Sequence, residues 1–281
     1  MGRVEVTLSL RRACPAALLL LSPLTKEKKT MRCLYRETIH KCGDTYLDVD
    51  IYPVYEKQRG RGPKRLPTSE VQDHLNKRNS QKKFVRLLNT NFTKRDIRFD
   101  LTYSDENLPS DVKEAQRLVQ NFFRRLKYMR RKLGLPELRY VMVTEYGEKK
   151  GRLHHHIVMS GGIDINVLAE LWGLGYTTVK PLQFDDRGLV DLATYLVKES
   201  ALKKLWSASR NLKRPEVKVR DGKISAHRVG EWALTGTDSR YQIEAKYPGY
   251  RLVDCLPYIN EVNGGVYLAL HLVRIPAKKK C

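Results

Sequence analysis

Cysteines are few in this sequence, and they follow no pattern. The five cysteines are odd in number, and no two of them form a C-x-x-C pair; they are Cys14, Cys33, Cys42, Cys255 and Cys281. A zinc finger needs closely spaced cysteine pairs, and a disulfide framework needs an even, dense set. The sequence therefore predicts neither of these and is typical of a reducing compartment such as the cytoplasm.

A hydrophobic run long enough for a membrane span is also missing. The apolar run Ala16–Leu21 follows two arginines and superficially resembles a signal peptide, but it is far too short to cross a bilayer. A more ordinary polar sequence begins at Met31. We therefore expect residues 1–30 to be a leader without structure, read from an upstream start codon. Mass spectrometry of the native N-terminus would test this.

Acidic residues are too few to balance the basic ones. Lys and Arg number 53 against 31 Asp and Glu, which gives a formal net charge of +22. Such an excess favours a polyanionic partner, because each neutralised phosphate releases counterions. Ribosomal, chromatin and membrane-surface proteins share this composition, so charge alone does not identify DNA.

The 281 residues can bury a sizeable core, in one domain with appendages or in two small domains. We expect a basic region at 31–95 with a strand at 45–52 and a helix at 68–88. A core at 96–206 would follow, with a β-containing extension at 207–281. In the core, predicted strands at 97–103, 139–145, 151–159 and 176–179 alternate with helices at 110–133, 166–172 and 188–205. This order predicts an α+β fold with helices on one face of a central antiparallel sheet.

The strand predicted around 151–159 contains three consecutive histidines. Side chains alternate along a strand, so His154 and His156 share one face, and Leu153 and Ile157 mark the other as the core face. Two neighbouring imidazoles can bind a divalent cation. We expect Glu145, across the hairpin, to be the third ligand and His155 to be packed in the core.

Two histidines and a carboxylate also bind Fe(II) in oxygenases. Cupin-type sites place a glutamate shortly after the H-x-H pair, whereas Ile157 and Val158 follow it here. An oxygenase is therefore a minor alternative.

The helix predicted at 188–205 presents a tyrosine that the core does not need. At one hundred degrees per residue, Leu189, Ala193 and Leu196 form one stripe, and Tyr195 and Lys198 fall opposite it. A phenol becomes a nucleophile when a nearby cation lowers its pKa. Tyr195 is therefore a candidate nucleophile, and Lys198 could stabilise phosphate charge or help to deprotonate it.

Basic and aromatic residues offer candidate contacts to nucleic acid. We assign DNA contacts to Arg152 and to the outer face of the 110–133 helix, at Arg124, Lys127 and Arg131. Tyr103, Trp172 and Trp206 could stack on unpaired bases, although core packing is expected for both tryptophans.

Three motifs together resemble those of HUH endonucleases. They are Leu101-Thr-Tyr-Ser-Asp-Glu-Asn-Leu-Pro109, Gly151-Arg-Leu-His-His-His-Ile-Val158 and Tyr195-Leu-Val-Lys198. Their order and spacing are most similar to rolling-circle replication initiation proteins of small single-stranded DNA phages and related prophages. The resemblance covers residues 97–205, so it is more specific than any single motif.

The resemblance implies a ferredoxin-like or RNA-recognition-type sheet that binds Mg²⁺ or Mn²⁺ through His154 and His156. Imidazole ligands alone would have suggested zinc. It further implies that Tyr195 forms a 5′-phosphotyrosyl link at a replication origin, in the cytoplasm of a bacterial host. The released 3′-hydroxyl would prime a host polymerase, with a host helicase as a further partner.

Two features depart from the family pattern. His155 occupies the position between the metal histidines that is usually bulky and apolar, and the third motif has a single tyrosine. A second protomer, or repeated use of Tyr195, would then have to close the circle. A transposase or relaxase of the same chemistry is one alternative, and a non-catalytic nucleic-acid-binding protein is the other.

Overall fold

The computed structural model describes residues 34–54, 70–147, 151–198, 206–259 and 265–275. The chain divides into two compact units, each with its own core. The terminal unit is drawn from residues 1–75 and 215–281, and the central unit comprises residues 76–214. The proposed leader at 1–30 lies outside the described residues. No helix in the described part of the chain is both long and apolar enough to cross a membrane.

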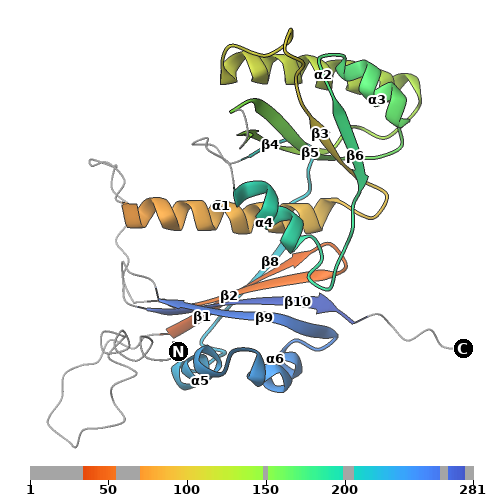
Figure 1. The fold of residues 1–281 in the computed structure, drawn as a ribbon. Coiled ribbons are helices and arrows are strands. Elements are labelled where there is room, and N and C mark those ends of the chain that lie inside the picture. Colours follow the sequence, from red (N-terminus) through yellow and green to blue (C-terminus); the bar gives the residue numbers. More distant parts are fainter. Residues whose placement is uncertain (1–33, 55–69, 148–150, 199–205, 260–264, 276–281) are drawn as a thin grey trace, which may run out of the picture. The chain divides into compact units, whose positions relative to one another are not determined.

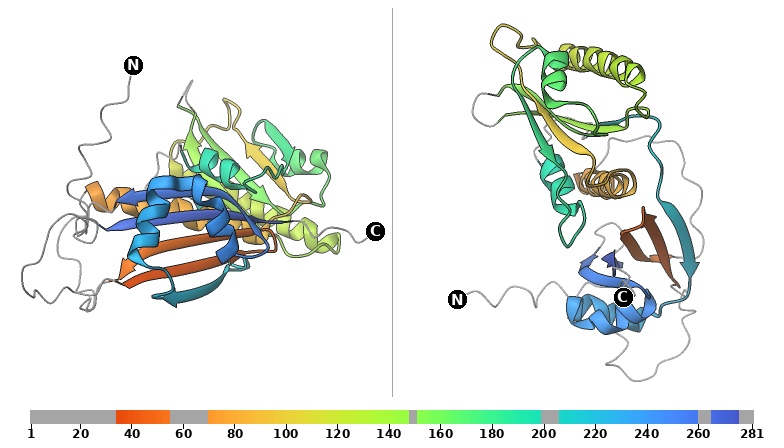
Figure 2. Two further views of the ribbon diagram at one scale, coloured as in Figure 1. Left: turned by 90° about the horizontal axis from the view of Figure 1, so that it is seen from below. Right: turned by 90° about the vertical axis from the view of Figure 1, so that its right-hand side faces the viewer.

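The terminal unit is a five-stranded antiparallel sheet with two helices across one face (Figure 2). Its strand order is β8-β1-β2-β10-β9. The elements are β1 (Leu34–Cys42), β2 (Tyr46–Val54), β8 (Glu216–Asp221), α5 (Ala226–Thr235), α6 (Arg240–Lys246), β9 (Tyr250–Ile259) and β10 (Val266–Arg274). β2 pairs with β10, so the two ends of the chain build one sheet.

Apolar residues of alternate strand positions form the core of the terminal unit, together with Val229, Trp232 and Ile243 of the helices. The predicted strand at 45–52 is confirmed as β2. Within the β-containing extension expected at 207–281, the sequence favours a strand across 241–254; this is wrong in its first part, because residues 240–246 form α6. Ile243 is buried in that helix, and periodicity over so few residues does not separate a short helix from a strand.

The central unit is built on a second five-stranded antiparallel sheet, with strand order β6-β3-β5-β4-β7. Its strands are β3 (Ile97–Leu101), β4 (Tyr140–Tyr146), β5 (Leu153–Met159), β6 (Thr177–Pro181) and β7 (Ser207–Ala208). Its helices are α1 (Glu70–Asn91), most of which belongs to this unit, α2 (Val112–Lys132), α3 (Ile165–Trp172) and α4 (Val190–Lys198). The predicted α+β class with an antiparallel sheet is confirmed.

The two faces of this sheet carry different helices, as Figure 1 shows. On the first face, alternate strand residues such as Phe99, Leu101 and Ile157 pack against α2 and α3. On the second face, Val143 and Val158 pack against α1 and α4. Helices thus cover the first face, as expected, and also part of the second face. The rest of the second face carries polar side chains.

The sequence predicts Ser110 as the N-cap of the helix at 110–133, and the cap of α2 lies one residue later. Asp111, not Ser110, is the N-cap residue, and its carboxylate accepts a hydrogen bond of 2.7 Å from the backbone N–H of Glu114. The helical period of the sequence places Phe122, Leu126 and Leu133 on one apolar stripe; Phe122 and Leu126 are buried, whereas Leu133 lies beyond the helix and is exposed. The buried face is centred on the sheet, so Arg124, Lys127 and Arg131 are exposed on the outer side of α2, whereas Arg130 is buried and donates to the carbonyl oxygens of Ser160 and Gly161.

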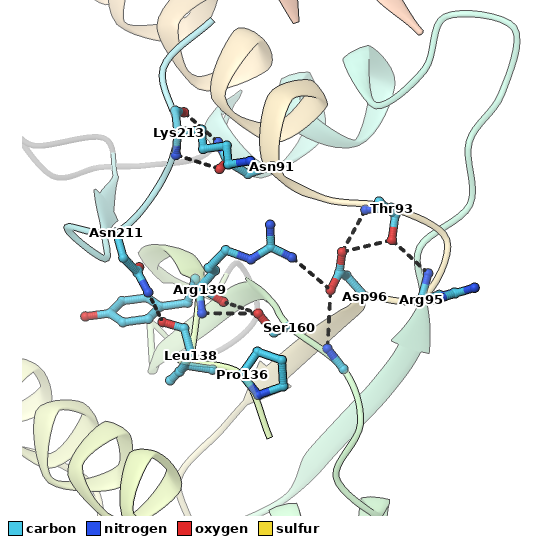
Figure 3. Close-up of polar contacts among 12 residues, drawn as sticks. Asn91, Thr93, Arg95, Asp96, Pro136, Leu138, Arg139, Ser160, Asn211 and Lys213 are labelled. Carbon is cyan, nitrogen blue, oxygen red and sulfur yellow. Dashed lines mark hydrogen bonds and ion pairs between the residues drawn. The ribbon is translucent and has the colours of Figure 1, made fainter. Parts of the chain in front are cut away.

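A polar network joins the ends of several elements at one edge of the central unit (Figure 3). The buried Asp96, just before β3, accepts hydrogen bonds from the backbone N–H of Thr93 (2.7 Å) and of Gly161 (3.4 Å). The side-chain amide of Asn91 both donates to and accepts from the backbone of Lys213, at 2.8 Å each. These contacts join the end of α1 and the start of β3 to the segments that follow β7 and β5.

We predict that Asp96→Ala destabilises the central unit by about 1–3 kcal/mol, because the Thr93 and Gly161 N–H groups lose the buried carboxylate that accepts their hydrogen bonds. Urea denaturation followed by tryptophan fluorescence would measure this, since Trp172 and Trp206 lie in the central unit. The matched control is Glu137→Ala, which removes an exposed carboxylate from the same unit. Equal midpoints for the two variants would contradict the prediction.

Candidate metal and tyrosine site

Three side chains converge on the polar part of the second face of the central sheet. Glu145 of β4 lies beside His154 and His156 of β5, and its Oε1 atom is 2.7 Å from the Nε2 atom of each histidine. One ligand atom from each residue falls within 4.8 Å of the others, a spacing that could hold a metal ion. We call Glu145, His154 and His156 the triad.

The strand register brings the triad together. In the hairpin of β4 and β5, Glu145 is the direct partner of His154, and His156 is two residues further along on the same face. On the other side of β5, Asp100 of β3 is the direct partner of His156. A shift of β5 by one residue would turn His154 and His156 to the first face. The triad therefore depends on the pairing of three strands.

Each histidine of the triad is held at its second ring nitrogen. Nδ1 of His156 donates to Asp100 Oδ1 at 2.6 Å, and Nδ1 of His154 donates to the carbonyl oxygen of Arg152 at 3.3 Å. We assign the protons to Nδ1 from these acceptors. Nε2 of each ring then faces the same point. Metal-binding histidines usually have such a carboxylate or carbonyl partner, so the triad fits a divalent cation.

The charges of the site perturb the pKa values of its members. Burial disfavours the charged form of His156, but hydrogen bonds to Asp100 and Glu145, and their charges, raise its pKa to about 9. Burial by itself raises the pKa of Glu145, but hydrogen bonds from His154 and His156 lower it to about 2. Without a metal, His156 therefore carries a proton between two carboxylates.

The middle histidine is a core residue, as the alternation predicted. His155 is fully buried on the first face, where Nδ1 lies 2.8 Å from the hydroxyl of Thr144 and Nε2 lies 2.8 Å from the hydroxyl of Tyr103. Burial, together with the nearby charge of the triad histidines, lowers the pKa of His155 to about 3. An uncharged imidazole with both nitrogens paired can replace the usual apolar residue here.

Tyr195 of α4 lies over the same face as the triad. Its ring centroid is 6.4 Å from that of His156, and its side chain is 51% exposed. The guanidinium of Arg98 on β3 stands 5.0 Å from the Tyr195 ring, within the range of a cation–π contact. The helix buries Ala193 and Leu196 and leaves the phenol free, as its periodicity predicted.

Gly147, at the start of the hairpin turn, leaves room for a triad histidine. A Cβ atom at this position would lie 3.2 Å from Cε1 and 3.3 Å from Nδ1 of His154, closer than side chains normally pack. Glycine therefore lets the turn pass directly behind the imidazole.

The remaining candidate residues are not members of the triad. Arg152 stands next to the triad and forms an ion pair with Asp105, and the side chain of Lys198 lies outside the described residues. The three basic candidates of α2 occupy the helix that covers the first face, away from the triad; they are Arg124, Lys127 and Arg131. Tyr103 and Trp172 are core residues, and the Trp206 indole donates to Ser80.

Arg98 and Asp100 belong to the site, although neither was assigned from the sequence as a catalytic or metal-binding residue. Asp100 accepts hydrogen bonds from Arg98 (2.8 Å) and from His156, and so connects the triad to the residue beneath Tyr195. The signal was present in β3, where Arg98 and Asp100 alternate with the buried Phe99 and Leu101. Only the pairing of β3 with β5 shows which polar face they join.

Residues 96–200 match the family model of replication-associated protein ORF2/G2P. The matched segment contains β3 through α4, and therefore the whole triad, Asp100 and Tyr195. This match confirms the resemblance to replication-associated proteins and supports a role in initiating replication. No curated protein and no solved structure matches the chain significantly.

We predict that divalent cation binding strengthens with pH. A cation needs the neutral imidazole, so binding to His156, with its pKa of about 9, must displace a proton. Affinity for Mn²⁺ is expected to rise about tenfold per pH unit between neutral pH and pH 8.5. Titration calorimetry at several pH values would measure it.

Two variants make this measurement specific to the triad. His154→Ala is expected to abolish the binding, whereas His227→Ala, which removes an exposed imidazole of α5, is expected to leave it unchanged. An affinity that does not change between pH 7 and pH 8.5, or equal effects of the two variants, would contradict the assignment.

Proposed function

We propose that this protein is a metal-dependent endonuclease that nicks and rejoins single-stranded DNA to start rolling-circle replication. The observation that carries the proposal is the position of Tyr195, half exposed on the same sheet face as the triad and 6.4 Å, ring to ring, from His156. A phenol beside a cation-binding group is the arrangement that phosphoryl transfer to tyrosine requires. The match to replication-associated proteins supports the initiation of replication as the process that this reaction would serve.

In the proposed reaction, Tyr195 Oη attacks the scissile phosphorus and the bond from phosphorus to the 3′ oxygen breaks. The phenol loses its proton, and the departing oxygen gains one to become a 3′-hydroxyl. The 5′ end remains on Tyr195 as a phosphodiester, so the bond energy is conserved and a second hydroxyl can reverse the step. This balance accounts for both cutting and joining.

Glu145, His154 and His156 would hold the cation, and Asp100 would orient His156. When bound, a divalent cation polarises the scissile phosphate and offsets charge in the transition state. Two nitrogen ligands and one oxygen ligand are compatible with several first-row metals, and Mg²⁺ or Mn²⁺ is proposed from the family resemblance.

Arg98 and Lys198 supply positive charge around the phenol in this proposal. The guanidinium of Arg98 is fixed by Asp100 and contacts the Tyr195 ring, so it restrains the nucleophile over the triad. Lys198, one helical turn after Tyr195, would stabilise the phosphate or accept the phenolic proton.

The proposed partner is the single-stranded origin of a phage or prophage in a bacterial cytoplasm. The released 3′-hydroxyl would be extended by a host polymerase, with a host helicase opening the duplex. Because the third motif has one tyrosine, closing the circle would use a second protomer or Tyr195 again.

The basic residues of α2 would contact DNA away from the cleavage point. Arg124, Lys127 and Arg131 lie on the helix of the opposite sheet face, so the same stretch of DNA that reaches the triad does not meet them directly. In this proposal they strengthen binding and do not take part in the chemistry.

We predict that the wild-type protein forms a covalent adduct with labelled origin DNA and Mn²⁺, visible in denaturing gels. Tyr195→Phe should abolish it, because the attacking oxygen is lost, and EDTA or His154→Ala with His156→Ala should nearly abolish it. The matched control is Tyr128→Phe, which alters a 63% exposed tyrosine on α2. An equal adduct from Tyr195→Phe would place the nucleophile elsewhere, and no adduct from any origin strand would favour a non-catalytic binder.

A triple alanine variant of Arg124, Lys127 and Arg131 should bind single-stranded DNA more weakly at every sequence. Each phosphate contact contributes a slope of about −0.7 in log affinity against log salt, so we expect the slope to fall by about 2. Fluorescence anisotropy at several salt concentrations would measure this. Gln120→Ala with Tyr128→Ala removes exposed uncharged side chains from the same helix, and an equal slope in the two variants would refute the contact.

A further inference from the structure

A pocket of about 640 Å³ opens beside the triad, in the size range of small-ligand sites. His154 lines it and is also a member of the triad, so the two sites share a wall. The other walls come from the loop after β3, the hairpin turn and the residue before β6. They include Thr102, Ser104, Asp105, Glu106, Gly147, Arg152 and Tyr176.

Tyr176 presents an aromatic ring to this pocket on a rigid backbone. Its side chain is 82% exposed, yet its carbonyl oxygen accepts hydrogen bonds from the Thr102 N–H (2.9 Å) and hydroxyl (3.0 Å). A Cβ atom on the preceding Gly175 would lie 2.5 Å from the Thr102 carbonyl oxygen, so only glycine permits this close pairing. A large ring on a fixed backbone that is left in solvent is available to stack on a ligand.

The polar groups of the pocket suit a base better than a phosphate. The one guanidinium, that of Arg152, is already paired with Asp105 and with the carbonyl oxygen of Tyr103 (2.8 Å). Asp105 and Glu106 add two exposed carboxylates, which repel a phosphate but accept hydrogen bonds from amino groups. Cytosine, adenine and guanine carry such amino groups, and thymine does not.

We propose that this pocket binds one unpaired base of the DNA strand, next to the phosphate at the triad. Tyr176 stacks on the base, and the carboxylates select bases with an exocyclic amino group over thymine. The pocket thereby contributes to the choice of cleavage position. This inference rests on the proposed function for the DNA partner, but it concerns binding and requires no cleavage.

The test measures binding of the full-length protein to short single strands of dA, dC or dT in EDTA, by fluorescence anisotropy. A salt concentration of about 200 mM weakens the phosphate contacts. We expect dA and dC to bind at least about fivefold more tightly than dT. Tyr176→Ala should weaken binding to dA and dC about 5- to 100-fold, whereas Tyr176→Phe should keep it, because the stacking ring remains.

Matched variants separate the pocket from general effects. Tyr128→Ala removes an exposed tyrosine from the opposite face and is expected to leave affinity unchanged. Glu106→Ala should reduce the preference against dT, and Glu137→Ala, an exposed carboxylate elsewhere in the unit, should not. Thermal melting of each variant confirms that the fold is kept. Tyr176→Leu keeps a large apolar side chain without the aromatic ring, so it distinguishes stacking on the base from the volume of the side chain.

Equal affinities of Tyr176→Ala and Tyr128→Ala would overturn the proposal, as would an unchanged preference in Glu106→Ala. Binding of free deoxynucleoside monophosphates as tightly as the strands would also overturn it, because the site would then serve a free nucleotide. Adduct formation by Tyr195 reports on the proposed function separately. A lost adduct with an intact Tyr176 effect would refute the nicking chemistry alone.

Discussion

The site depends on the register between three antiparallel strands, β4, β5 and β3. Because each cross-strand pair is fixed by backbone hydrogen bonds, Glu145 is held opposite His154 and Asp100 opposite His156. The buried His155, bonded on both ring nitrogens, anchors the other face of the same strand. Packing on the first face therefore sets the geometry of the charged groups on the second.

The charges of the site are balanced by pairing, not by exposure. Protonated His156 donates one N–H to Asp100 and the other to Glu145, and Arg98 neutralises Asp100 from the other side. Buried charges are tolerated only when they are paired or bind a metal. The two carboxylates would therefore destabilise the folded protein if neither a cation nor protonated His156 offset their charge. The same chain of contacts ends beneath Tyr195, which connects the triad to the position of the phenol.

Much of the central site could be predicted because it depends on short-range periodicity. Alternation along β5 separated His154 and His156 from His155, and the helical period of α4 separated Tyr195 from the core. Glu145 could be predicted because a short hairpin turn places the end of β4 opposite the histidines of β5. Asp100 and Arg98 could not be assigned in the same way, since β3 reaches β5 only after a long crossover through α2 and β4.

The amino-acid sequence by itself determined the α+β class, the residue types of the candidate metal site, the exposed tyrosine and the strong positive charge, because each is a local or compositional property. Tertiary structure alone decided that the regions expected at 31–95 and 207–281 share one sheet through β2 and β10, and that the basic face of α2 lies opposite the triad. It also decided that Tyr176 and the carboxylates of Asp105 and Glu106 line one pocket beside His154. These are long-range pairings, and no local pattern specifies which distant strand or loop a segment will meet.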